Sequence, residues 1–469
     1  MKGKSEYKGH TCMQWIVTLI ANISTFVYGM EVGWMSPTTK ILQSKSSPLG
    51  YALSDTALSL VASSTCFAGA FGVTIFSYST DKFGRKLTVI AITIPQFISI
   101  ILRIISPTLT ALLIARILAG LVAGGCFIVV PIYVKEISQK NNSGILVSLQ
   151  VLLQNVGLFI MFLMGIYVNY YNILLITSIF PILSLILFWY IAPESPAYLV
   201  KQKKIDEAYK AVALLRGLKR DDKNVENEIT ILKHSEEEQK LLPNMTLKDI
   251  LSDKAWRNGV ILALILFTAQ ALNGAFAIIT YASPILSATG VEFDVAPEFQ
   301  TLSLPVVMIL ASFLLTFIIE RLGRKVILSV SFLISAVALT SLSISIFVRN
   351  FGGRVLSFLP VVAMMLSVAM YSGCICSVSY LVTTELFNFQ VRGKLMGIVL
   401  SYAFMVFFIP LAVYSPITNM FGQHITFLFF GMMNIIGAFF SFFCLPETKG
   451  RSDEEIRNIL WNRKKENSY

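Results

Sequence analysis

Apolar and polar residues alternate along this chain in long blocks rather than at short periods. Apolar blocks of roughly 20 residues, the length that a helix needs to cross the hydrocarbon core of a bilayer, are separated by short charged segments. The blocks predict twelve transmembrane helices in two sets of six. The first set lies near 13–31, 56–78, 87–106, 110–133, 146–168 and 172–192, and the second near 258–281, 299–319, 326–347, 355–383, 395–417 and 424–444.

A polar stretch separates the two sets. Between 201 and 255 it carries 12 Lys/Arg and 11 Asp/Glu, with apolar residues at helical spacing. This pattern predicts short amphipathic helices packed under the bundle, and a solvated charged loop is the alternative. We therefore expect an all-α membrane protein with five parts. They are an N-terminal segment 1–11, a six-helix bundle 12–200, a helical linker domain 201–255, a second six-helix bundle 256–446 and a tail 447–469.

Composition excludes several classes of protein. Hydrophobic residues make up 55% of the 469 residues and charged residues only 14%, with a mean hydropathy of +0.70. A soluble protein of this length cannot bury so much apolar surface. The six cysteines lie in or beside apolar blocks, and Cys374 and Cys376 have no histidine near them, so we expect neither a disulfide framework nor a metal site. The three scattered histidines offer no hydrolytic site, and we expect no enzyme and no cofactor.

The formal net charge of +11 is distributed as a topology signal. Its basic residues form short clusters at the N-terminus, in alternate loops and in the tail. A nucleic-acid-binding protein would gather them on one face, so we expect no nucleic-acid partner. The positive-inside rule then places both termini in the cytoplasm. We expect a multi-pass plasma membrane protein that works as a monomer in the lipid bilayer.

The charged loops of the first half recur in the second half in the same order. The offsets between the copies are 239, 249 and 253 residues, about half the chain. Parallel repeats of this kind build transporters that rock around a site between the halves. The copies are Asp81-Lys-Phe-Gly-Arg-Lys86 and Glu320-Arg-Leu-Gly-Arg-Lys325, then Glu136 and Glu385, then Pro193-Glu-Ser-Pro196 and Pro446-Glu-Thr-Lys449.

The repeated residues have the chemistry of a gate. Acids at helix ends and basic residues after a glycine turn can form ion pairs between neighbouring helices. Such pairs are individually weak, but a network can bias two conformations. The alternative is that they only set topology. The predicted cytoplasmic gate residues are Asp81, Arg85, Glu136, Glu320, Arg324, Glu385 and Arg392.

These motifs resemble the sugar porter family of the major facilitator superfamily. Pro131-Ile-Tyr133, the two charged loops and the Pro-Glu motifs all match, and Gly33-Trp34-Met-Ser-Pro37 looks like the insect facilitated trehalose transporters. The resemblance covers nearly the whole chain. It implies a major facilitator fold of two six-helix pseudo-repeats.

The resemblance also implies a central cavity in which amides and hydroxyls bind the hydroxyl groups of a small sugar. Gln270-Ala-Leu-Asn-Gly274 resembles the glutamine motif of the seventh span, and Gln270 is the favoured ligand. Each amide has an alternative role as a link between two helices. The predicted sugar ligands are Gln270, Asn273, Tyr281, Gln150, Gln154, Asn155 and Tyr380.

Glu31 is an acid late in the first span, where proton-coupled relatives in the family resemble one another in carrying one. Arg116 in the fourth span matches the partner of that acid. Acids inside a membrane are candidates for function. The alternative is that Glu31 has reached the outer interface and is solvated.

The sequence thus supports three hypotheses. The first is facilitative transport of a hexose or trehalose by alternating access. The second is proton-coupled sugar symport through Glu31. The third is a sugar receptor that does not transport, or a carrier of another solute, favoured by departures from the family pattern such as Ala271.

Overall fold

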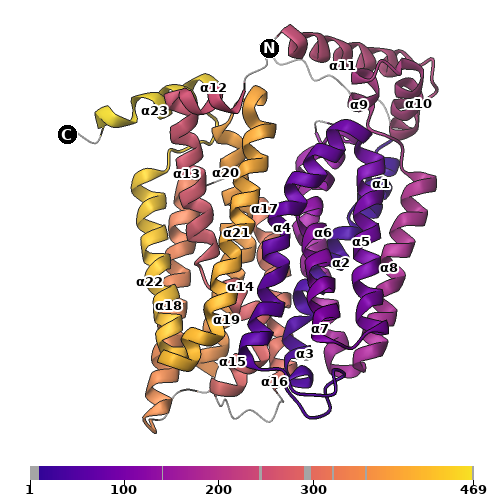
Figure 1. Ribbon diagram of the computed structural model, residues 1–469. Coiled ribbons are helices and arrows are strands. Elements are labelled where there is room, and N and C mark those ends of the chain that lie inside the picture. Colours follow the sequence, from indigo (N-terminus) through magenta and orange to yellow (C-terminus); the bar gives the residue numbers. More distant parts are fainter. Residues whose placement is uncertain are drawn as a thin grey trace.

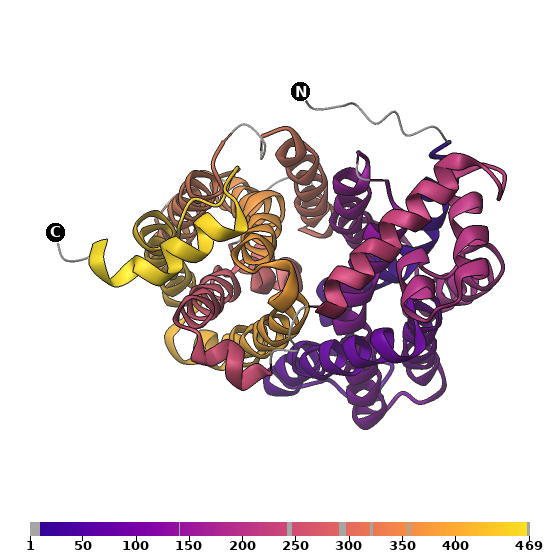
Figure 2. The ribbon, with the colours of Figure 1, turned by 90° about the horizontal axis from the view of Figure 1, so that it is seen from above.

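The structure is a computed structural model that describes residues 10–139, 141–241, 246–289, 297–318, 322–353, 356 and 358–466. The regular elements of these residues are helices. Two bundles stand side by side along a common axis (Figure 1), and the view from above separates them clearly (Figure 2). The all-α fold predicted from the apolar blocks is confirmed.

The first bundle is built from helices between Cys12 and Ile191. Its first span is divided into short successive helices, whereas the hydropathy suggested one continuous helix. Its helices are α1 (Cys12–Ala21), α2 (Ile23–Gly33), α3 (Met35–Leu42), α4 (Asp55–Phe83), α5 (Arg85–Ile105), α6 (Leu109–Ile137), α7 (Ser143–Tyr167) and α8 (Tyr170–Ile191).

The second bundle is more interrupted than the first. Its seventh span is broken at Gly274. Its tenth span changes pitch at a π-helical segment. Its helices are α13 (Lys254–Ala271), α14 (Ala275–Thr280), α15 (Ala282–Thr289), α16 (Pro297–Thr301), α17 (Ser303–Ile318), α18 (Arg324–Asn350), α19 (Phe358–Met370), η1 (Tyr371–Cys376), α20 (Ser377–Leu386), α21 (Phe389–Phe421), α22 (Gln423–Phe439) and η2 (Phe440–Cys444).

The spans agree with a membrane protein. Within the described residues, 11 helices are long and apolar enough to cross a membrane, and Phe299–Leu314 is a shorter apolar helix. This shorter helix lies in the eighth predicted span, so the six-plus-six pattern is present in the fold. The exposed apolar side chains of both bundles, such as Ile179 and Phe443, face outward as the bilayer requires.

Local sequence signals explain where the long helices begin. Ser54 and Thr108 accept hydrogen bonds from the backbone N–H three residues on, at 3.2 Å each. Asn388 does the same for Val391 at 3.3 Å. These N-caps satisfy donors that a helix leaves open at its first turn. Glycine then allows α4 and α6 to pack closely, because a Cβ on Gly120 would lie 2.2 Å from the Thr65 carbonyl oxygen.

One end of the bundles, called here the upper end, carries additional helices. They are α9 (Pro196–Lys201), α10 (Ile205–Arg216), α11 (Lys223–Leu241) and α12 (Leu247–Ser252) between the bundles, and α23 (Asp453–Glu466) after the second. Figure 1 shows them at the top of the view. Helices α9–α11 share a small core that includes Ala208, Val212 and Ile229. The described part of the charged segment is therefore mostly helical, and α9–α11 are packed together, as the apolar spacing of its residues predicted.

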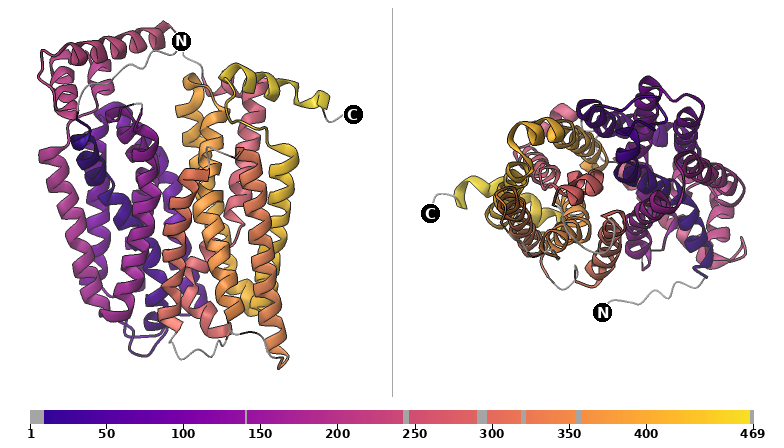
Figure 3. Two further views of the ribbon diagram at one scale, coloured as in Figure 1. Left: turned by 180° about the vertical axis from the view of Figure 1, so that it is seen from behind. Right: turned by 90° about the horizontal axis from the view of Figure 1, so that it is seen from below.

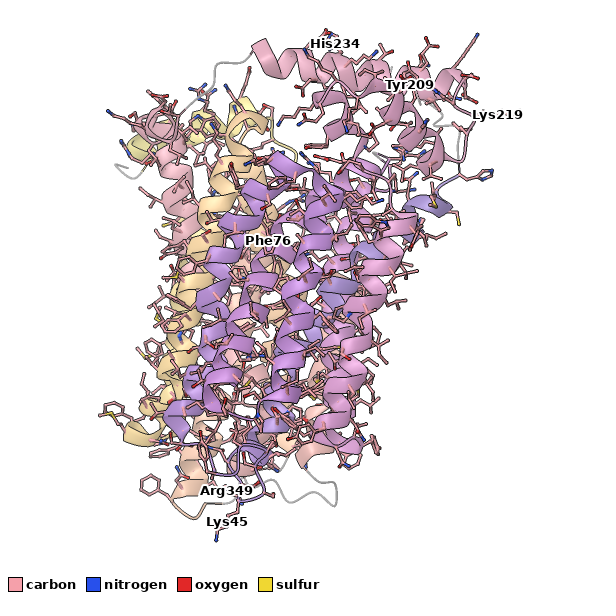
Figure 4. The ribbon with its side chains drawn as sticks, turned by 45° about the vertical axis from the view of Figure 1, so that its right-hand side comes forward. Lys45, Phe76, Tyr209, Lys219, His234 and Arg349 are labelled. Atoms are coloured by element: carbon pink, nitrogen blue, oxygen red, sulfur yellow. The ribbon has the colours of Figure 1, made fainter. Side chains whose placement is uncertain are left out.

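The opposite end, called the lower end, consists of short connections. Figure 4 labels Lys45 and Arg349 at this end and Tyr209, Lys219 and His234 at the upper end. The views from behind and from below (Figure 3) show the two bundles meeting along their length. Helix α4 packs on α21, and α7 packs on α17. These two pairs make the largest contacts between the halves, and smaller contacts join α3 to α15, α2 to α14 and α6 to α21.

Candidate functional site

The upper end of the first half holds an ion pair between α5 and α6. Arg85 donates from Nε and Nη2 to the two carboxylate oxygens of Glu136, at 2.9 and 3.0 Å. The Ser195 hydroxyl, at the start of α9, donates to the same carboxylate. This geometry is bidentate and partly buried, which makes it stronger than an exposed ion pair.

Glu194 ties a second helix to this site. Its carboxylate accepts the backbone N–H groups of Arg85 at 3.0 Å and of Lys86 at 3.1 Å, at the first turn of α5. A carboxylate at a helix N-terminus caps open donors and complements the helix dipole. Burial raises the pKa of Glu194, while backbone hydrogen bonds from Ser195, Lys86 and Arg85 oppose that rise.

The second half repeats this arrangement residue for residue. Arg324 of α18 contacts Glu385 of α20 at 3.2 Å. Thr448 donates to Glu385 as Ser195 does to Glu136. Glu447 accepts the backbone N–H groups of Arg324 at 3.0 Å and of Lys325 at 3.2 Å. The repeated motifs of the sequence therefore build the same network twice, at the same end of the molecule.

Three predicted gate residues lie outside these networks. Asp81 is exposed, with no ion pair to the other residues that the structure describes. Arg392 folds back onto the Phe387 carbonyl oxygen, with Nε at 3.1 Å and Nη2 at 2.8 Å. Glu320 falls outside the described residues. The Arg85–Glu136 and Arg324–Glu385 ion pairs thus each lie within one half in this conformation.

The two halves meet through uncharged polar side chains. Asn155 of α7 donates to Ser312 of α17 at 3.0 Å and to Ser372 of η1 at 2.8 Å. Nearer the lower end, Ser59 of α4 donates to Ser415 of α21 at 2.7 Å. Towards the upper end, Ser401 donates to the Ala70 carbonyl oxygen at 3.1 Å.

A cavity lies between the halves near the middle of the bundle. Tyr28, Val32, Ala62, Thr65, Cys66 and Arg116 line it from the first half, and Phe276, Thr280, Phe404 and Leu411 line it from the second. The seven predicted sugar ligands are absent from this lining. In this conformation the cavity is therefore walled mostly by aromatic and aliphatic side chains.

Gln270 and Tyr281 nevertheless lie close to the interface. Gln270 is buried at the end of α13, beside Tyr371 and Cys376. Its Oε1 atom has no hydrogen-bond donor among the described residues. Tyr281 stacks on Tyr414 with a centroid distance of 4.6 Å and an interplanar angle of 10°, and its hydroxyl reaches Ser59 of the other half at 3.4 Å.

Two of the predicted ligands are engaged inside their own half. Asn273 donates to the side chain of Asn434 on α22 and accepts from the Ala275 N–H at 3.3 Å. Gln150 donates to the Cys126 carbonyl oxygen on α6 at 3.0 Å. Both side chains link helices, which is the alternative role that the sequence left open. Gln154 and Tyr380 are partly buried, and their side chains make no hydrogen bond to other described residues.

Glu31 is buried in a cluster of charges on one side of the cavity. Its two carboxylate oxygens contact Arg103 of α5 and Arg116 of α6 separately, the latter at 3.3 Å. The Glu31 side chain is only 3% exposed, so the alternative that it is solvated at the outer interface is wrong. Arg116 was the expected neighbour.

Sequence reasoning missed Arg103 and Trp34 in this cluster. The guanidinium carbons of Arg103 and Arg116 lie 5.0 and 5.7 Å from the Trp34 ring centre. A lone arginine inside an apolar block was the signal for Arg103, because a cation at that depth needs a partner. Trp34 gave no such signal, because tryptophan is ordinary in a membrane span.

Comparison with known proteins agrees with this architecture. Residues 17–460 match the family described as sugar (and other) transporter. The facilitated trehalose transporter Tret1 of Polypedilum vanderplanki is 28% identical over 454 residues, covering 96% of this chain and 88% of that protein. Tret1 of Anopheles gambiae is 27% identical, and the chain spans only 56% of its length.

Solved structures show the same fold. The inward-open xylose transporter XylE from E. coli has a TM-score of 0.77 at 18% identity, over 95% of this chain and 99% of that one. The partially occluded inward-open form has a TM-score of 0.76 at 17% identity, over 92% of this chain and all of the other. The predicted major facilitator fold is thereby confirmed. The family match over nearly the whole chain shows that this protein belongs to the sugar transporter family.

Proposed function

We propose that this protein is a facilitative carrier that moves a hexose or trehalose across the membrane by alternating access. The observation that carries the proposal is the network of Arg85 and Glu136 repeated by Arg324 and Glu385 at the same end of both halves. A receptor needs no repeated network at a helix-packed end, whereas two rocking halves do. The substrate gradient is the driving force.

Neutral polar groups between the halves support a neutral polyol as substrate. Asn155, Ser372 and Gln270 offer amide and hydroxyl groups, which can both donate to and accept from sugar hydroxyls. The unpartnered Oε1 of Gln270 makes it the first candidate ligand. Tyr281, Gln154 and Tyr380 are further candidates. Asn273 and Gln150 are positioned to stabilise helix packing instead.

The charge distribution supports a cytoplasmic upper end. Arg85, Lys135, Lys325 and Arg392 lie at helix ends on that side, and positive charge favours the cytoplasm. Both termini are then cytoplasmic in the plasma membrane. Because the interface between the halves forms within one chain, a monomer is sufficient for transport.

The contacts between the halves support a conformation closed at the lower, outer end. Asn419 donates to Asp55 across the halves at 3.0 Å, and the Tyr281–Ser59 and Ser59–Ser415 contacts lie above it. These bonds must break when the carrier opens outward. The networks of the upper end are then expected to come together and close the cytoplasmic side, with Asp81 and Arg392 as candidates for new contacts.

Proton-coupled symport is the second candidate, because Glu31 is buried beside Arg116. The charge count of the cluster favours facilitative transport. A proton on Glu31 would leave two buried guanidinium groups without a counter-ion, which is costly in a low-dielectric site. Uptake should therefore be independent of external pH.

Uptake of labelled trehalose and glucose in cells that lack their own sugar carriers tests the proposal. Trehalose comes first because the midge and mosquito relatives are named as trehalose transporters. We expect saturable uptake of at least one sugar, equal at two external pH values. Surface labelling must confirm expression. Absence of uptake of both sugars by protein at the surface would contradict the proposal.

A further inference from the structure

The Glu31 cluster has an unusual stoichiometry for a site inside a membrane span. One carboxylate lies between two arginines that come from different helices, Arg103 on α5 and Arg116 on α6. Each arginine takes a separate carboxylate oxygen, and Arg116 also donates to the Glu31 backbone oxygen at 3.0 Å. The side chains of all three residues are at most 3% exposed.

The surroundings of the cluster supply no second acid among the described residues. The other titratable side chains that face it are Tyr28 of α2, Cys66 of α4 and Tyr170 of α8 in the first half, and Tyr281 after α14 in the second. Phenol and thiol groups are ordinarily uncharged at neutral pH. The cluster therefore holds one negative and two positive charges, and Glu31 is the anion on which both arginines depend.

Arg103 is held in place independently of Glu31. Its Nε donates to the Ser99 backbone oxygen at 3.3 Å, and its guanidinium lies over the Trp34 ring at 5.0 Å. The Arg116 guanidinium also lies over the Trp34 ring, so one aromatic side chain makes cation–π contacts with both arginines. The Nη1 atom of Arg103 has no acceptor among the described residues. Arg103 therefore has no nearby anion to turn to if Glu31 became neutral.

We propose that Arg103 is a positioning residue that keeps Glu31 charged throughout the transport cycle and so prevents proton coupling. With Arg103 present, protonation of Glu31 leaves two buried cations without a counter-ion. Without Arg103, the remaining pair of Glu31 and Arg116 is neutral, and protonation of Glu31 leaves only one buried cation without a counter-ion. Glu31 could then take a proton from the outer solution and release it to the inner one. This inference rests on the proposed sugar transport.

The test compares uptake at about pH 7.5 and about pH 5.5 in four variants. Arg103→Gln should make uptake rise with acid by about threefold to tenfold, since one proton per cycle changes the rate by at most about tenfold per pH unit. Arg103→Lys restores a cation and should remain independent of pH. Arg103→Gln with Glu31→Gln should also lose the dependence. Lys45→Gln removes an exposed cation at the lower end (Figure 4) and serves as the matched control.

A second measurement separates this inference from the proposed function. Infrared spectra of the purified protein report the carbonyl stretch of a protonated carboxylic acid without any transport. An acid band assigned to Glu31 should appear at low pH in Arg103→Gln, vanish in the double variant and be missing from the wild type. If wild-type protein carries no sugar but these bands appear, the proposed function fails, and only the role of Arg103 in keeping Glu31 charged is supported. Equal pH profiles and equal spectra for wild type and Arg103→Gln would overturn the inference.

Discussion

The ring of Tyr281 lies flat on the ring of Tyr414, with centroids 4.6 Å apart and planes 10° from parallel. The two residues belong to the same half, and the Tyr281 hydroxyl extends to Ser59 of the other half at 3.4 Å. The stack therefore presents a rigid aromatic surface to the first half at the lower end. Its place between the cavity and the lower loops makes it a candidate for an outer gate in the proposed orientation.

Removing this stack should open the outer side more often. An aromatic pair contributes about 0.5–1.5 kcal/mol, so Tyr281→Ala should raise the outward-open population by about twofold to tenfold. Cys66 lines the cavity and can report on its accessibility. In a variant whose other five cysteines are serine, an impermeant thiol reagent added outside should label Cys66 faster after Tyr281→Ala. Tyr281→Phe keeps the ring and is the control; equal labelling of all three proteins would argue against an outer gate here.

The two ion-pair networks at the upper end should contribute unequally to transport. Arg85 holds Glu136 through two hydrogen bonds, whereas the contact of Arg324 with Glu385 has a single short distance of 3.2 Å. We expect Arg85→Gln to reduce uptake more than Arg324→Gln does. A double-mutant cycle of Arg85→Gln with Glu136→Gln should give a coupling energy of about 1 kcal/mol in thermal unfolding. Additive effects of these two changes would show that the pair is not coupled.

Two buried glutamines allow a matched comparison between a candidate sugar ligand and a residue that links two helices. Gln270 has an unpartnered Oε1 beside the interface, and Gln150 is bonded to the Cys126 carbonyl oxygen. Gln270→Ala should raise the KM for sugar severalfold with little change in Tm. Gln150→Ala should lower stability by about 1 kcal/mol and leave KM near wild type. The reverse pattern would exchange their roles.

The break in the seventh span at Gly274, and the Asn273 side chain beside it, should contribute to the stability of the fold rather than to sugar binding. Gly274 has φ of 89°, a left-handed conformation that disfavours side chains, and an added Cβ would lie 2.7 Å from the Phe430 ring. Asn273 bonds Asn434 beside it. Asn273→Ala should therefore cost about 1–3 kcal/mol of stability, because Asn434 would lose a buried partner. Thermal unfolding of the purified variant measures this. An unchanged Tm combined with a raised KM would instead make Asn273 a sugar ligand.

The fold could be predicted from the sequence because its signals are local. Apolar blocks of membrane length, charged loops and repeated motifs each lie in one continuous stretch of sequence, and the described residues show the expected spans and ion pairs at these positions. The interruptions were harder to predict. The π-helical segment Tyr371–Cys376 has no proline, and the break at Leu272–Gly274 changes which residues share a face. Helical spacing beyond such a break no longer tells which way a side chain points.

The site could be predicted only in part for the same reason. Asn273 and Gln150 have the amides of a sugar ligand, but their partners on α22 and α6 are distant in sequence and decide their role. Arg103 pairs with Glu31 across 72 residues, and a motif gives no sign of that contact. Arg116 was placed correctly beside Glu31 because the family pattern contains both positions.

Counterflow in sealed proteoliposomes tests the central claim most directly. Vesicles loaded with unlabelled trehalose or glucose are diluted into labelled sugar, with and without an imposed pH gradient. The account predicts transient accumulation of label driven by the internal sugar, final equilibration of the sugar across the membrane, and no effect of the pH gradient. Lack of counterflow with both sugars, or uphill accumulation sustained by an acidic exterior, would contradict it.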